Sequence, residues 1–205
     1  MSALWALCKS NPNYIFVFFA AAVFKMQEVF TTDFLTLWYI SFEDDGTIEE
    51  DESAELYQEM FIYACCASLI AVPLIGIIGD RFRSTIMIPL AFVWRAVSLC
   101  LFPLVTTPES PLATFVIILT VVGTTLEIVS VCLLLYRDMP NKLRGVLIGG
   151  MSVGGHMGKL IFAGIGGWMF DELGRCAPQL FMAYCDIFMF LLAIIFIQQG
   201  YIKNK

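Results

Sequence analysis

Six runs of apolar residues occupy most of this chain, and each run is long enough to cross a lipid bilayer as a helix. A membrane-spanning helix needs about 20 predominantly apolar residues. Hydrophobic residues make up 59% of the sequence, and the mean hydropathy is +0.80, which is more apolar than a soluble domain. We therefore predict an all-α, polytopic membrane protein with no separate soluble domain, whose spans cover about residues 14–42, 56–79, 84–105, 112–136, 145–170 and 179–201.

The loop after the first span, residues 43–55, is strongly acidic. Residues 43–59 hold nine of the eighteen acidic side chains and no basic one, so the net charge of -6 comes largely from this part of the chain. The loop is interpreted as solvated and flexible. Docking to a basic partner and binding of a divalent ion are the alternatives, although Asp44-Asp45-Gly46 lacks a full calcium-loop pattern.

Basic residues gather on the side of the membrane where both chain ends lie. Such a bias marks the cytoplasmic side, so both termini are expected there, or on the matrix-equivalent side of an organelle. The sequence leaves the membrane open, and the mitochondrial inner membrane is one candidate. The basic residues of this side belong to an interfacial N-terminus (1–13), a motif loop (76–84), a basic loop (137–144) and a basic tail (202–205): Lys9, Arg81, Arg83, Arg137, Lys142, Arg144, Lys203 and Lys205, against Arg175 alone on the other side.

A short charged turn joins the second and third spans. It begins at Gly76 and carries Asp80, Arg81 and Arg83 before Ser84. Asp80 can accept hydrogen bonds from an arginine or lie against the positive end of a helix. Ser84 is placed to cap the third span.

This turn resembles the loop motif of the major facilitator superfamily, Gly-x-x-x-Asp-Arg-x-Gly-Arg-Arg. The match covers Gly76, Asp80 and Arg81, whereas Arg83 replaces the usual glycine, and Ser84 and Thr85 replace the usual bases. The glycine-rich fifth span, from Arg144-Gly145 to Gly174, resembles the penultimate helix of that family's C-terminal half.

The resemblance implies a single six-helix half, built of two three-helix repeats, where a full transporter has about twelve spans in two halves. In this family the first helix of each repeat lines the central cavity, which corresponds here to spans one and four. The second and fifth helices pack against the other half, so a second copy or another membrane subunit is expected against spans two and five. The chain could also be a fragment of a longer product, but Met1 and the basic tail favour a complete short chain.

Polar and ionisable residues within the spans are costly in lipid, so they mark either a pathway or an internal pair. Lys25 can pair with Glu28 three residues away, and Glu127 can pair with Arg95 or Lys159. His156 is either a titrating residue or a hydrogen-bonded packing residue. Arg95 is interpreted as a structural counter-ion, and Asp186, nearer the outer face, as a similar group. The candidate substrate or ion pathway comprises Lys25, Glu28, Thr32, Asp33, Thr120, Thr124, Glu127, His156 and Lys159, with Ser130 and Ser152 on the same polar faces.

Three glycines recur every four residues on the fifth span: Gly150, Gly154 and Gly158. Small residues at this spacing let another helix approach closely. Packing within the six-helix unit and packing against another chain both remain open. In the second case Asp80 would lie near the N-terminal end of a partner helix.

No chemistry-bearing motif points to an enzyme. The seven cysteines lack metal-ligand spacing, and no phosphate-binding Gly-x-x-x-x-Gly-Lys-Ser/Thr loop occurs. We expect no cofactor, no metal and no nucleic-acid partner. Two functions fit: a half-size secondary transporter of a small solute, working as a dimer or with a partner chain, or a transport-inactive, transporter-derived subunit of a larger membrane complex such as a respiratory assembly.

Overall fold

The computed structural model describes residues 11–49, 52–138, 140 and 143–202, and in them six helices are long and apolar enough to span a membrane. This confirms the prediction of an all-α polytopic fold. The interfacial residues 1–10, the tail residues 203–205 and parts of the acidic and basic loops (50–51, 139, 141–142) lie outside the described residues. The elements are α2 (Asn13–Val29), η1 (Phe30–Phe34), α3 (Leu35–Asp44), α4 (Glu52–Arg81), α5 (Ser84–Cys100), η2 (Phe102–Leu104), α6 (Pro111–Asp138), α7 (Arg144–Leu173) and α8 (Ala177–Gln198).

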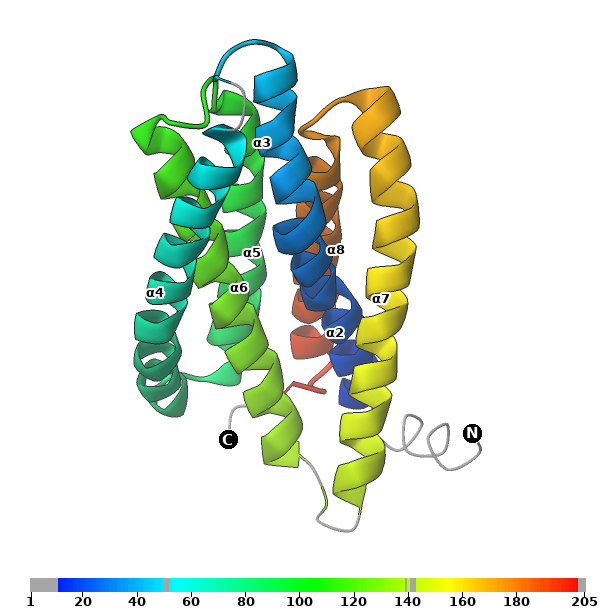
Figure 1. Ribbon diagram of the computed structural model, residues 1–205. Helices are drawn as coiled ribbons and strands as arrows, with labels where there is room; N and C mark the ends of the chain where they lie inside the picture. Colours follow the sequence, from blue (N-terminus) through cyan, green and yellow to red (C-terminus); the bar gives the residue numbers. More distant parts are fainter. Residues whose placement is uncertain (1–10, 50–51, 139, 141–142, 203–205) are drawn as a thin grey trace.

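The helices form one bundle in which α4 and α7 flank the others on opposite sides (Figure 1). α5 packs against α6 and α8, while α2 packs against α6, α7 and α8. In their most apolar stretches only 17% of α4 and 22% of α7 is buried, compared with at least 50% in the first, third and fourth spans. The second and fifth spans therefore leave most of their apolar surface uncovered by this chain.

Aromatic side chains fill the core near the loop between the first two spans. Trp38 is fully buried and makes edge-to-face contacts with Phe42 and Phe102, at centroid separations of 4.9 and 5.8 Å. Such aromatic pairs add about 0.5–1.5 kcal/mol each beyond burial. They fix the end of α3 against η2.

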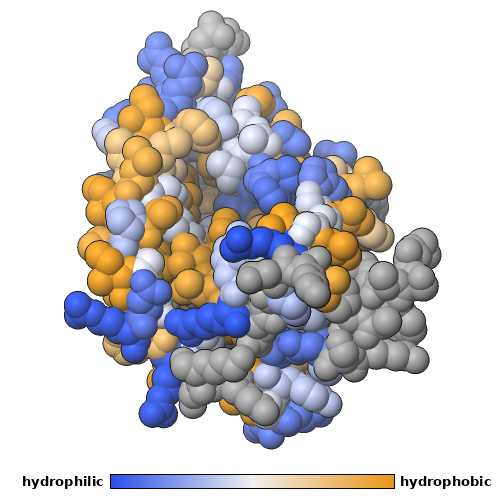
Figure 2. All heavy atoms as spheres, turned by 90° about the horizontal axis from the view of Figure 1, so that it is seen from below, coloured by the Kyte–Doolittle hydropathy of each residue, from blue (hydrophilic) through white to orange (hydrophobic). Residues whose placement is uncertain are grey.

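The described ends of the chain meet at one end of the bundle. The Asn13 side-chain amide donates to the Tyr201 backbone carbonyl at 2.9 Å, as an even number of spans requires. Seen from this end, hydrophilic residues gather on the exposed face and hydrophobic residues lie along the flanks (Figure 2). At the opposite end, Arg175 pairs with Asp45 of the acidic loop at 2.8 Å and lies over the Phe42 ring.

The glycines of α7 lie against α2 of the same chain. A Cβ on Gly158 would lie 2.2 Å from the Ala22 carbonyl oxygen, and one on Gly154 would lie 3.0 Å from the Phe18 carbonyl oxygen. At these two positions the glycines therefore pack within the six-helix unit, which is one of the two alternatives left open by the sequence. Gly150 is half-buried.

The motif loop differs from the sequence prediction at Ser84. Arg83 occupies the N-cap position of α5, and Ser84 is the first helical residue. Its hydroxyl instead accepts a hydrogen bond from Nη1 of Arg137 at 2.6 Å, while Nη2 of Arg137 donates to the Gly79 carbonyl at 3.1 Å. Arg137 thus ties the end of α6 to the motif loop. The side chains of Asp80, Arg81 and Arg83 are exposed.

Candidate functional site

A groove of about 700 Å³ runs between α2, α4 and α6. Apolar walls from Phe24, Phe61, Leu69 and Ile128 enclose a set of hydrogen-bonding side chains. Polar groups inside a bilayer-spanning bundle are found where they face water or one another. Those of the groove are Gln27, Glu28, Thr31, Thr32, Ser68, Thr124 and Thr125.

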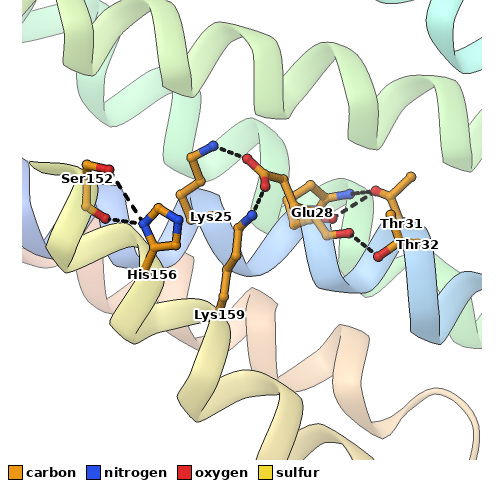
Figure 3. A network of polar contacts seen from close by, with 8 residues as sticks. Lys25, Glu28, Thr31, Thr32, Ser152, His156 and Lys159 are labelled. Carbon is orange, nitrogen blue, oxygen red and sulfur yellow. Dashed lines mark hydrogen bonds and ion pairs between the residues drawn. The ribbon is translucent and has the colours of Figure 1, made fainter.

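Glu28 joins the groove to a cluster of charges halfway across the bundle. It stands at the middle of the first span (Asn13–Asp44), and Lys159 stands at the middle of α7. The carboxylate of Glu28 contacts the ammonium groups of both Lys25 and Lys159, one on each oxygen (Figure 3). The three side chains remain 45%, 36% and 30% exposed, in the order Glu28, Lys25, Lys159. The cluster therefore lies at the surface of the bundle and at mid-membrane depth.

A π-helical turn, Phe30–Phe34, begins two residues after Glu28. The hydroxyl of Thr31 donates to the Gln27 carbonyl and that of Thr32 to the Glu28 carbonyl, both at 2.9 Å. Threonines that bond back to the preceding turn bend helices, and such turns often occur at functional sites. Thr31 and Thr32 lie three and four residues after Glu28, so they stand beside it on the groove wall.

His156 lies next to this cluster on α7. Its Nδ1 lies 2.7 Å from the Ser152 carbonyl oxygen and 3.5 Å from the Ser152 hydroxyl. Nδ1 therefore carries the hydrogen that the carbonyl accepts when the ring is neutral, which leaves Nε2 as the acceptor. Figure 3 shows the ring on the same side of the bundle as Lys25 and Lys159.

A second charged group is closed inside the bundle. Arg95 of α5, Glu127 of α6 and Asp186 of α8 are each 0% exposed and stand near the middle of their spans. Nε of Arg95 donates to Oδ2 of Asp186 at 2.7 Å, and Nη2 contacts Oδ1. Nη1 contacts Oε2 of Glu127. This triad links α5 to α6 and α8 and makes no part of the groove wall.

No protein-family model matches the chain. The chain is similar to the magnetosome protein MamH of Paramagnetospirillum magneticum (strain ATCC 700264 / AMB-1), with 25% identity over 179 residues. The matched region is 87% of this chain but 42% of that protein, so the chain spans less than half of the length of this curated relative.

The predicted pathway residues fall into three places in the structure. Thr32 and Thr124 line the groove together with Glu28, whereas Lys25 and Lys159 contact Glu28 and His156 bonds to Ser152. Thr120 is 1% exposed and lies in the core beside the groove, and Asp33 is exposed but lies outside the groove wall. Glu127 faces Arg95, so the internal pair is the arrangement observed, and Asp186 lies at mid-span and not nearer the outer face.

Four polar residues of the groove are not among those predicted from the sequence: Gln27, Thr31, Ser68 and Thr125. Gln27 and Thr31 lie one turn apart on the first span, and the Gln27 side-chain amide donates to the Thr31 hydroxyl at 3.1 Å. Ser68 lies on α4, a helix that the family resemblance assigns to contacts with a partner. Thr125 directly follows a predicted residue and falls on the neighbouring face. In the described residues, no three His, Cys, Asp or Glu side chains lie close enough to hold a metal ion.

Proposed function

We propose that the chain is a half-size secondary transporter of the major facilitator type, and that the groove between α2, α4 and α6 is its half of a pathway for a small polar solute. The observation that carries the proposal is a groove with seven hydrogen-bonding side chains at mid-membrane depth, bordered by the Lys25–Glu28–Lys159 cluster. The threonine hydroxyls of the groove donate to carbonyls of the preceding turn, but the charged side chains of the cluster stay 30–45% exposed. Exposed charge at that depth is expensive against lipid, which favours water and a second wall on this face.

A second copy or another chain of similar size would supply that wall. The chain covers 42% of the similar magnetosome protein, which leaves room in a relative of that length for another six-helix unit. The exposed sides of α4 and α7 flank the groove side of the bundle, where spans two and five of such a transporter meet the other half. No nucleotide-binding loop is present in the sequence, so an ion or solute gradient would drive transport, with Glu28 and His156 as the groove-side groups able to carry a proton.

Two neighbouring cysteines of α4 give a direct test. Both thiols are exposed, but Cys65 lines the groove and Cys66 is not part of the groove wall. Two variants would each keep one of these two cysteines and carry serine at the other six cysteine positions. In native membranes, a charged, membrane-impermeant thiol reagent should modify Cys65 at least tenfold faster than Cys66, because only a hydrated thiol ionises and reacts. Equal rates at the two positions would contradict a water-filled pathway.

The transport step itself can be measured in proteoliposomes. Panels of small sugars, amino acids and organic acids would be added outside, and internal pH followed with a trapped dye. At least one solute should move protons with the wild-type chain, and Glu28→Gln should abolish the signal. Glu59→Gln, on the exposed end of α4 away from the groove, is the matched control and should leave the signal unchanged.

A transporter-derived structural subunit is the second candidate, and one observation favours it. The mid-membrane charges are paired within the chain: both lysines of the cluster contact Glu28, and Arg95 contacts two acids. Internal pairs of this kind allow a partner to seal the face without supplying charges. In that case Cys65 and Cys66 would both be inert in the native membrane, and no solute would move protons.

A further inference from the structure

The buried triad contains more acid than base. Glu127 and Asp186 face one guanidinium, and all three side chains are 0% exposed. The remaining titratable group near Arg95 in the described residues is the thiol of Cys185, beside Asp186. α2 also packs against α6 and α8, and α4 against α6. The mid-span charges of α2 and α7 are held in the separate Lys25–Glu28–Lys159 cluster, and the charged residues of α4 stand near its two ends.

The charge balance of the triad therefore depends on a proton. With both acids ionised, the site would carry one net negative charge out of contact with water, which is a cost of several kcal/mol in a low-dielectric interior. Binding one proton makes the site neutral, and the guanidinium keeps its charge under all accessible conditions. A neutral site is the arrangement that a bundle core at mid-membrane depth tolerates.

The geometry distinguishes the two acids. Asp186 takes a two-point contact in which Nε and Nη2 of Arg95 reach its two oxygens, the arrangement that favours an ionised carboxylate. Glu127 meets Nη1 alone, and neither of its oxygens makes a well-oriented hydrogen bond. One turn along α6, the buried hydroxyl of Ser130 also lacks a hydrogen-bond partner in the described structure, which provides an acceptor on the same helix face.

We propose that the Arg95–Glu127–Asp186 triad is a binding site for one proton and that Glu127 holds this proton at neutral pH. Arg95 and Asp186 then form the ion pair, and Glu127 is a neutral acid in contact with Nη1. The site is separate from the groove, because none of the three residues lines it. It joins α5, the last helix of the first three-helix repeat, to α6 and α8 of the second.

Infrared spectroscopy of the full chain in lipid nanodiscs tests the proposal directly. A protonated carboxylic acid has a carbonyl stretching band that a carboxylate lacks. The wild-type chain at pH 7 should show this band, and Glu127→Gln should lose it, whereas Glu28→Gln should retain it. The proposal is overturned if the wild type has no such band, or if the band persists in Glu127→Gln.

Stability gives an independent readout. Because glutamine reproduces a neutral glutamic acid, Glu127→Gln should fold and melt within a few degrees of the wild type at pH 7, whereas Asp186→Asn should melt far lower. If Glu127 holds a proton in the folded chain and loses it on unfolding, the unfolding constant rises with pH. The unfolding constant of the wild type should therefore increase up to about tenfold more per pH unit than that of Glu127→Gln. A Glu127→Gln chain that fails to fold, or parallel pH profiles, would contradict the assignment.

Discussion

Arg95 and Lys159 both stand at the middle of a span, but their surroundings differ, so the two cations should contribute differently to the free energy of unfolding. Arg95 is fully buried between two acids, whereas Lys159 is 30% exposed and shares Glu28 with Lys25. Ionisable residues in apolar runs told us from the sequence alone that each needed a partner. The sequence did not identify the partner of each residue, because Arg95 and Lys159 lie at similar depth and either could pair with Glu127. The packing of α5 against α6 and α8 decides that Glu127 pairs with Arg95.

Replacing each cation with methionine should separate a buried pair from an exposed one. Arg95→Met should lower the free energy of unfolding by about 3–5 kcal/mol, because Asp186 is left as a buried charge without a cation. Lys159→Met should cost less than about 1 kcal/mol in detergent, because the pair is open to water and Glu28 keeps Lys25. Unfolding in detergent followed by circular dichroism measures both, and equal losses would contradict the distinction.

The first span combines two helical segments, α2 and α3. The sequence indicated a continuous helix over about 14–42, and the structure has the π turn Phe30–Phe34 within it. The five residues include no glycine or proline that would mark a break, so apolar periodicity alone could not place it. The extents of the other spans were predictable to within a few residues because charged and glycine- or proline-containing segments bound them.

The contact between α2 and α7 depends on a glycine at one position and not at another. Gly158→Ala should lower the free energy of unfolding by about 1–3 kcal/mol, because the new methyl group would overlap the Ala22 backbone and push the helices apart. Gly149→Ala is the matched control on α7. A Cβ there meets nothing within 4 Å, so alanine's helix propensity should stabilise the chain by about 0.5–1 kcal/mol. Thermal unfolding of the two variants should therefore shift in opposite directions.

At the scale of the whole molecule, one side of the bundle combines exposed apolar helices with a polar groove. α4 and α7 expose large apolar residues, with Leu69 and Leu160 at 74% and 76%, and the polar groove opens beside them. Lipid can cover the apolar faces, but the partly exposed charges of Lys25, Glu28 and Lys159 at mid-membrane depth are costly against it. The family resemblance predicts that spans two and five meet a partner, and this stays a prediction. The shape of the groove needed the third wall from α4, which the sequence did not indicate.

Under the proposed function, a second copy of the chain would cover this side, and we expect its presence to depend on Asp80. In the resemblance, this exposed carboxylate lies near the positive N-terminal end of a partner helix, an interaction worth about 0.3–1 kcal/mol at an exposed site. Native mass spectrometry from a mild detergent should therefore show pairs of chains, with fewer pairs for Asp80→Asn. Asp171→Asn is the matched control, because Asp171 is an exposed acid near the C-terminal end of α7, and it should leave pairing unchanged. Thiol crosslinking from Leu69→Cys in native membranes gives a second readout. The paired arrangement would be contradicted by single chains that are stable in detergent and form no crosslink. Crosslinks to a different protein would assign the cover to a partner subunit.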